Sequence, residues 1–420
     1  MNDGTSVEAL TGSPRHNEQA PGIDPALAAF AGRKLAVTVA LAIVLALGVS
    51  AYALHGQGSP ALAISLLFGA AFGIVLQRSR FCFFCMFREW FDDRAPQGIL
   101  GLVVALAVGL IGTTLVFGAW LPDAGTGRLP PDAFIGPVSV ALAAAGIAFG
   151  AGMAISGSCV SAHLYRLGEG SPTAPFALLG TVIGFVLGFV SWNTIYTAAV
   201  ADAPVVWLPR TLGYAGHLLV AGAVLGLIAY AVTRSSPRKP VEQARPRDQV
   251  TAVFIDRWPA WIGGAIIGVL ATMSYLRVAP LGVTAELGSR ARQLAGALEL
   301  APTRLQGLDS LRGCIAVVRD ALLSPNGAFV LGVVAASLAA ALVAGQFKPQ
   351  RPRIDHVLRG LTGGVLLGWG AMTGLGCTVG TLFSGVTAGA LSGWVFGASL
   401  FTGTAVTLWS GRRLGLLPRG

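Results

Sequence analysis

Long apolar runs separated by short polar segments dominate the chain. Each run is long enough, at about 17 to 25 residues, to cross the roughly 30 Å hydrocarbon core of a bilayer as a helix. The runs are continuous and rich in Ala, Leu, Val and Gly, whereas a membrane β-barrel needs short alternating segments. We therefore predict an all-α polytopic membrane protein with about ten spans, near residues 35–54, 61–77, 99–121, 134–155, 174–196, 214–233, 259–276, 328–346, 358–375 and 388–410.

Polar segments divide the predicted spans into two halves. Residues 1–34 lack hydrophobic periodicity and are predicted to be a disordered cytoplasmic tail rather than a cleaved leader. A first membrane repeat is expected over 35–233 and a second over 259–410, joined by a basic cytoplasmic linker at 234–258. Residues 411–420 are expected to be a second cytoplasmic tail.

Two glycine- and cysteine-containing segments, 218 residues apart, are copies of one another. The segment GIAFGAGMAISGSCVSAHL surrounds Cys159, and GVLLGWGAMTGLGCTVGTL surrounds Cys377. Since each half holds five predicted spans, an odd number, the second repeat is expected to be inverted relative to the first. Inverted repeats commonly build a transport site between broken helices near the middle of the bilayer. Besides the cysteines, the copies match at Gly146 and Gly364, Gly150 and Gly368, Gly152 and Gly370, and Leu164 and Leu382.

Composition and charge agree with a membrane protein and exclude a nucleic-acid partner. Hydrophobic residues make up 54% of the chain and charged residues 11%, which is too few charges for a soluble surface of this size. The net charge is +10. If the N-terminus lies in the cytoplasm, 21 of the 29 Lys and Arg residues fall on the cytoplasmic side of the membrane and 8 on the outer side. We therefore predict a multi-pass protein of the bacterial inner membrane with both termini in the cytoplasm.

Each cysteine copy has the features of a helix interrupted inside the membrane. Gly157 and Gly376 stand just before the cysteines, and glycine adopts the backbone angles that a turn needs. A short helix beginning at each cysteine would direct unpaired N–H groups and a positive dipole end inward, which suits an anion. Neutral thiols are weak, polarizable donors, so a soft sulfur or selenium anion fits them better than phosphate. The candidate substrate-binding residues of the two copies are Cys159, Ser161, Cys377 and Thr378.

A third cysteine motif, QRSRFCFFCMFREWFDD, occupies residues 77–93. Cys82 and Cys85 have C-x-x-C spacing, which indicates dithiol chemistry in redox enzymes. The phenylalanines between and beside the two sulfurs instead favour a pore constriction. Arg80 is a candidate for guiding anions to the entrance, the alternative being that it marks the cytoplasmic boundary.

Three segments taken in order resemble the signatures of the YeeE/YedE family of membrane sulfur transporters. They are QRSRFCFFCMFREWF, GAGMAISGSCVSAHLYRLGEGSP and GWGAMTGLGCTVGTLFSG, and the likeness covers most of residues 60–410. The resemblance implies an inverted-repeat fold with short re-entrant half-helices. It also implies an hourglass-shaped path along which Cys82, Cys159 and Cys377 pass thiosulfate through S–H contacts, and a cytoplasmic TusA-like sulfur carrier as partner. Cys85 is additional to the family pattern.

Several functions stay open at this stage. Uptake of thiosulfate or a related sulfur anion is favoured, and the chain has no nucleotide-binding motif that would supply ATP drive. The alternatives are a selenium-compound transporter of the same family, a membrane thiol oxidoreductase using Cys82 and Cys85, and a subunit that only docks a sulfur-handling protein. No cofactor or metal is predicted, because His163 and His217 have no second ligand at metal-site spacing and are expected to make local hydrogen bonds.

Two expectations concern local structure. Arg166 and Glu169, in the LYRLGEG segment, are expected to form an ion pair that supports the turn. Residues 285–300 form an amphipathic helix that lies on the membrane surface in one interpretation. In the other, symmetry places this helix opposite the half-helix of Cys82, with Gly282 and Thr284 at its entrance.

Overall fold

The predicted all-α class is confirmed by the structure, a computed structural model that describes residues 25–236, 249–302, 304–308, 311 and 323–417. In this part of the chain nine helical spans are long and apolar enough to cross a membrane, and a bent helix pair makes a tenth. Each predicted span has its helix. They are α1 (Pro25–Gly56), α2 (Pro60–Ser79), α4 (Gln97–Trp120), α5 (Val140–Ser156), α7 (Ala174–Ile195), α8 (Leu208–Arg234), α10 (Ala260–Arg277), α12 (Pro325–Val343), α13 (Ile354–Thr373) and α15 (Leu391–Arg413).

Helical structure reaches into three segments that were predicted to lie outside the spans. Helix α1 begins inside the predicted tail, at Pro25, because proline is favoured in the first turn and the following residues are rich in alanine. A short helix, α9 (Gln249–Phe254), lies in the predicted linker, and α15 extends to Arg413 in the predicted C-terminal tail. Residues 1–24, 237–248 and 418–420 lie outside the described residues.

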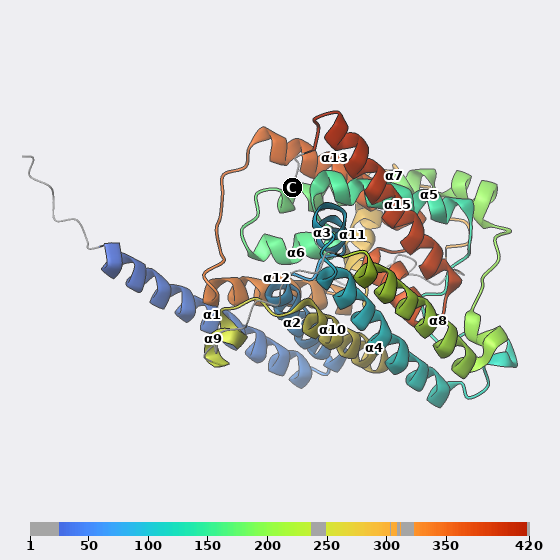
Figure 1. Cartoon of the computed structure of the whole chain (residues 1–420), viewed down its shortest axis with the longest axis horizontal. Coiled ribbons are helices and arrows are strands. Elements are labelled where there is room, and N and C mark those ends of the chain that lie inside the picture. The colour runs from blue at the N-terminus through green and yellow to red at the C-terminus, as the bar shows by residue number, and fades with distance from the viewer. Residues whose placement is uncertain (1–24, 237–248, 303, 309–310, 312–322, 418–420) are drawn as a thin grey trace, which may run out of the picture.

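The long helices form two groups of four, and each group takes two helices from each half of the chain. Helices α5, α7, α13 and α15 pack together through the pairs α13 with α7, α15 with α5 and α13 with α5. Helices α2, α4, α10 and α12 form the other group through α12 with α2, α10 with α4 and α10 with α2. The labels of the two groups stand in the upper and lower parts of Figure 1. Equivalent helices of the two halves thus make equivalent contacts.

Four short helical segments follow long helices after brief interruptions and join the two groups. Helix α6 contacts α2 and α12 of one group and α7 of the other, and α11 contacts α7 and α12. In Figure 1 the labels of α3, α6 and α11 stand between the two groups. The segment after α13 bends from it by 44°. The four segments are α3 (Phe83–Asp93), α6 (Val160–Gly168), α11 (Val283–Ala297), and the π-helix η3 (Thr378–Ser384) continued by α14 (Gly385–Thr387).

The glycines shared by the two cysteine copies lie where helices cross. A Cβ atom added to Gly152 of α5 would stand 2.7 Å from the carbonyl oxygen of Gly363, and one added to Gly370 of α13 would stand 2.7 Å from that of Ala145. No side chain fits at such distances, so these glycines let the backbones of α5 and α13 approach closely, as small residues do in membrane helix pairs.

The amphipathic segment that follows α10 does not lie on the membrane surface, so that interpretation is wrong. Helix α11 begins at Val283, and Thr284, Ala291 and Ala295 are completely buried. The small side chains on this face of α11 pack between α7 and α12. This packing outweighs the attraction of the charged face of α11 to the membrane surface. Since α11 follows α10 as α3 follows α2, its place agrees with the symmetry interpretation, and Gly282 is its N-cap residue.

Candidate functional site

Each of the three predicted substrate-binding cysteines is the N-cap residue of a short helical segment. Cys82 precedes α3, Cys159 precedes α6 and Cys377 precedes η3, and all three side chains are completely buried. No N-cap side chain accepts a hydrogen bond from the first turn of any of these segments. Backbone N–H groups and positive dipole ends therefore stand next to each sulfur, an arrangement that favours a negative charge.

The starts of these three segments line one small cavity. Its volume is about 10 Å³, close to the space of a single water molecule. Ser161 and Val379, which are equivalent positions of the two cysteine copies, both line it. The phenylalanines expected to form a constriction near Cys82 contribute Phe81 and Phe83 to its lining, and the remaining residues are also bulky and apolar: Phe72, Leu76, Ile267 and Phe383.

The two interruptions are closed by equivalent side-chain hydrogen bonds. In the first copy the Nε2 atom of His163 lies 3.1 Å from the hydroxyl of Ser156. In the second copy the hydroxyl of Thr381 donates to the carbonyl oxygen of Gly374 at 2.9 Å. Residues 163 and 381 are 218 positions apart, and so are residues 156 and 374. A hydrogen bond between equivalent positions therefore spans the break in both copies. This geometry supports the duplication.

The turn before each cysteine has its left-handed residue at the same position in the two copies, but only the first copy has glycine there. Gly157 has a φ of 84°, as predicted for a turn that needs glycine, and its N–H donates to the carbonyl of Met153 at 2.9 Å. In the second copy the left-handed residue is Leu375, with a φ of 58°, so the expectation that Gly376 takes this role is wrong. The N–H of Gly376 instead donates to the carbonyl of Ala371 at 2.8 Å.

The structure brings the thiols of the first two motifs together. The Cys82 side chain neighbours those of Cys159 and Cys85, and the Cys159 sulfur lies 3.2 Å from the hydroxyl of Ser161. Cys377 belongs to the same hydrophobic core, but in the described residues no hydrogen bond joins it to another cysteine. The neighbouring Thr378 hydroxyl is buried and has no partner among the described residues, so it is free to donate.

Arg166 and Glu169 do not form the expected ion pair. The Arg166 guanidinium donates instead to the sulfur of Cys85 at 3.1 Å and to the carbonyl of Gly157 at 3.4 Å. Glu169 follows the last residue of α6, where its carboxylate accepts from Gln77 and lies 3.9 Å from Arg80. Arg166 therefore supports the turn before Cys159 through its hydrogen bond to the Gly157 carbonyl. Glu169 pairs with Arg80 instead.

The two histidines differ in their surroundings. His163 makes the local hydrogen bond that was predicted, whereas neither ring nitrogen of the buried His217 has a partner among the described residues. The prediction for His217 is therefore wrong. Within the described ranges, no cluster of His, Cys, Asp and Glu side chains is arranged to hold a metal ion.

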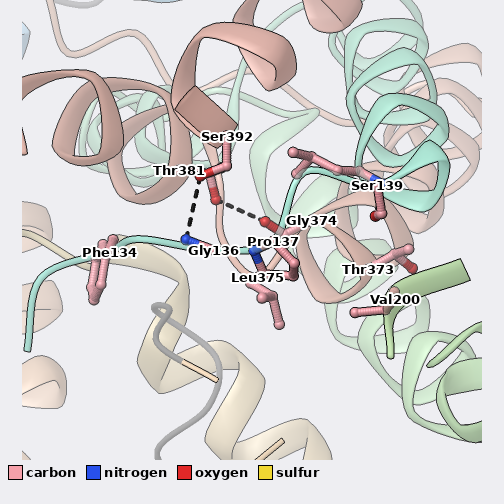
Figure 2. A pocket seen from close by; sticks show the side chains of 11 residues that line it. Phe134, Gly136, Pro137, Ser139, Val200, Thr373, Gly374, Leu375, Thr381 and Ser392 are labelled. Carbon is pink, nitrogen blue, oxygen red and sulfur yellow. Dashed lines mark hydrogen bonds between the residues drawn. The ribbon is translucent and has the colours of Figure 1, made fainter. Parts of the chain in front are cut away.

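A second hollow, of about 20 Å³, lies beside the break before Cys377 and is lined partly by hydroxyl groups. Figure 2 shows Thr381 bonded to Gly374, and Ser392 accepting from the N–H of Gly136 at 3.3 Å. Thr373 also lines the hollow, and its buried hydroxyl has no partner among the described residues. Sequence reasoning missed these hydroxyls because most come from distant segments, although Thr373 stands only four residues before the repeated cysteine.

Comparison with known proteins identifies the family. The profile of a family described as sulphur transport matches residues 78–406, which includes all three cysteine motifs. The chain belongs to this sulphur transport family. The chain is 28% identical over 362 residues to the thiosulfate transporter TsuA of Spirochaeta thermophila, a match that covers 82% of this chain and 97% of that protein.

Two further relatives cover different shares of the chain. The thiosulfate transporter TsuA of Escherichia coli is 26% identical over 370 residues, covering 82% of this chain and 93% of the relative. The probable transporter YedE of the same organism is 29% identical over 168 residues, covering 40% of this chain and 39% of the relative. This member of the sulphur transport family therefore matches both TsuA proteins over nearly their whole length.

Replacing Arg166 with glutamine is expected to raise the KM for the transported anion by about tenfold while leaving the protein folded. Among the described residues no carboxylate lies within 4.0 Å of its guanidinium, so its charge is available to an anion near Cys85. Glutamine keeps an N–H donor for the turn but removes the charge, and a hydrogen bond to a charged group contributes about 1.5–3 kcal/mol. Initial uptake rates over a range of anion concentrations measure the effect.

Arg80→Gln is the matched control for this change, because Arg80 is partly exposed and stands near a carboxylate already. Its KM should change by less than about twofold, since an exposed ion pair contributes only about 0–1 kcal/mol. Equal effects of the two substitutions, or loss of the folded protein with Arg166→Gln alone, would show that the charge of Arg166 does not act on the anion.

Proposed function

We propose that this protein takes up thiosulfate, or a closely related sulfur anion, across the bacterial inner membrane without direct ATP drive. The observation that carries the proposal is the meeting of three buried, uncapped helix starts, each with a cysteine at its N-cap, at one constriction. Membership of the sulphur transport family and the names of the two relatives matched over most of their length support the choice of anion.

The chemistry of the site suits an anion that carries a soft terminal sulfur. The thiols offer weak S–H donors, and the backbone N–H groups beside them offer stronger ones to the oxygen atoms. Thr373, four residues before Cys377, lines the hollow of about 20 Å³, whereas Phe83, next to Cys82, and Ser161, two residues after Cys159, line the smaller cavity. In our proposal the anion passes from one sulfur to the next, with Ser161 and Thr378 donating to it on the way.

Passage requires the constriction to widen. A cavity of about 10 Å³ holds no anion of this size, so the aromatic side chains around it must move apart during each transport cycle. The short helical segments are suited to this motion, because each is separated from its long helix by an interruption. In the proposed arrangement the two repeats are inverted, the half-helices are re-entrant, and the constriction lies near the middle of the bilayer.

Orientation and partner belong to the same proposal. We propose that both termini and the basic linker lie in the cytoplasm, because Lys and Arg are concentrated in these segments and in the loops on the same side. A TusA-like sulfur carrier is proposed to receive the imported sulfur there. A selenium-compound anion is the alternative substrate, since its size and softness would satisfy the same donors.

A second candidate function is a membrane thiol oxidoreductase, and one contact favours it. Cys82 is the N-cap residue of α3, and Cys85, one turn further along, neighbours it, as a dithiol pair requires. In that function either Cys85→Ser or Cys82→Ser would abolish activity, whereas a transport path needs Cys85 less.

The purified full-length protein in vesicles is expected to accumulate radiolabelled thiosulfate with saturable kinetics. Unlabelled thiosulfate should compete, and a tenfold excess of sulfate should not, because sulfate replaces the soft terminal sulfur with a strongly hydrated oxygen. Vesicles without protein provide the background rate. Transport of a selenium anion but not thiosulfate would select the alternative substrate, and transport of neither would contradict the proposed function.

A further inference from the structure

A large apolar hollow lies behind two of the short helical segments, away from the cysteines. Its volume is about 310 Å³, which is within the size range of small-molecule sites. Fifteen residues line it, none of them charged, and they come from α3, α4, α8, α15 and the η3–α14 segment. Phe87 of α3 and Leu382 and Val386 of η3–α14 form its inner wall. The hollow therefore touches the segments that begin at Cys82 and Cys377.

The hollow opens toward the bilayer between α8 and α15. Helix α8 packs mainly on α4, and at the opening Ile228 and Ala398 are exposed. Another apolar hollow, of about 320 Å³, continues along the same face of α15. The lining residues of α15 follow one another at helical spacing through both hollows, from Trp394 through Ala398, Phe401, Ala405 and Leu408 to Arg412.

Two arginines, Arg413 of α15 and Arg94 at the end of α3, have no carboxylate partner among the described residues and stack on tryptophans of the two hollows. The guanidinium of Arg413 stacks 4.1 Å from the ring of Trp409, and that of Arg94 stacks 4.6 Å from the ring of Trp90. Neither lies within 4.0 Å of a carboxylate in the described part of the chain, whereas the nearby Arg412 is paired with Asp92. Each tryptophan lines one of the two hollows, so the positive charges are held at their rim.

We propose that these two hollows bind a phospholipid with an anionic headgroup. An acyl chain fills the apolar hollow between α8 and α15, and the phosphate lies at the rim against Arg413 and Arg94. Twelve residues of α15 separate Phe401 from Arg413, a rise of about 18 Å, which matches the depth of one leaflet from headgroup to mid-chain. The bound lipid packs against Leu382 and Phe87 and so stabilises the two cysteine-bearing segments from behind.

Native mass spectrometry of the delipidated full-length protein tests this site. Phosphatidylglycerol is expected to form a one-to-one adduct at lower concentrations than phosphatidylcholine. Arg413→Gln should weaken the phosphatidylglycerol adduct roughly fivefold, the contribution of one basic residue to anionic lipid binding. Ala398→Trp, which blocks the opening with an apolar ring, should weaken the adducts of both lipids.

Two substitutions elsewhere on the lipid-facing surface serve as matched controls. Arg234→Gln removes an exposed arginine from the end of α8, and Ala144→Trp adds the same ring to an exposed position of α5. Both should bind phosphatidylglycerol as the intact protein does. Adducts of unchanged strength in Arg413→Gln and Ala398→Trp, or an equal loss in the controls, would overturn the proposal. Because the readout is lipid mass, the result is independent of which anion the protein transports.

Discussion

Alanine at Cys159, Cys82 or Cys377 is expected to lower thiosulfate uptake by about tenfold or more in each single variant. Each substitution removes one donor from a buried site, and a hydrogen bond to a charged group contributes about 1.5–3 kcal/mol, or about one to two powers of ten in rate or affinity. All three sulfurs are completely buried next to uncapped helix starts, where water cannot take over their role. Initial rates in vesicles, normalised to the amount of folded protein, measure the loss.

Serine at the same positions separates the proposed mechanisms. A hydroxyl donates hydrogen bonds but does not form disulfides, so Cys159→Ser should retain more uptake than Cys159→Ala if the thiols act as donors. Cys85→Ala should lose less than the other three, because Cys85 contacts Arg166 and Cys82 but does not begin a helix.

Each outcome of the cysteine series has a distinct meaning. Equal and complete loss in Cys85→Ser and Cys82→Ser, with serine no better than alanine, would favour the dithiol oxidoreductase. Unchanged uptake in all three alanine variants would show that the three cysteine side chains only fill space in the core. Chromatography of each variant in detergent establishes that the folded protein is present.

Gly368→Ala is expected to destabilise the protein by about 1–3 kcal/mol or more, although it adds only one methyl group. A Cβ atom at this position would stand 2.8 Å from the backbone nitrogen of Phe185 and overlap the carbonyl oxygen of Thr181. Backbone atoms cannot move aside as a flexible side chain does, so α13 and α7 would have to separate. A lower apparent melting temperature in detergent, with a smaller yield of monodisperse protein, measures the effect.

Gly222→Ala is the matched control, and its effect should have the opposite sign. A Cβ atom there would meet nothing within 4 Å, because Gly222 lies on the exposed face of α8. Alanine is favoured over glycine in a helix interior by roughly 1 kcal/mol, so the control should be unchanged or more stable. Equal destabilisation of the two variants would mean that the crossing of α7 and α13 is not the tight point of the fold.

Most of the helical framework could be predicted from the sequence, because spans are long and hydrophobic runs are hard to mistake. The positions of Cys159 and Cys377 at helix starts follow from the glycine breaks before them, whereas Cys82 follows the charged end of α2. The copy relationship also indicated which glycines pack, since Gly152 and Gly370 recur at one place in each half. These are local signals, and the local structure agrees with them.

Long-range contacts were harder to predict. The bond between Arg166 and Cys85 joins residues 81 positions apart, and nothing near either residue in the chain indicates it. Glu169 seemed the natural partner of Arg166 at three residues' distance, but it lies beyond the end of α6, where helical spacing no longer applies. The left-handed angle of Leu375 was missed for a related reason, because two adjacent glycines were the better candidates by conformational preference.

The sharing of helices between the two groups constrains how the chain matures. Helix α5 is made early, yet its main partners, α13 and α15, are the last two long helices to be synthesised. Until then the glycine-lined faces of α5 contact lipid instead of helices. In the same way, α2 lacks its main partner until α12 has been made. Neither half is therefore an autonomous unit, and the proposed anion-binding centre can form only in the final stage of biogenesis, once α13 and α15 have been made.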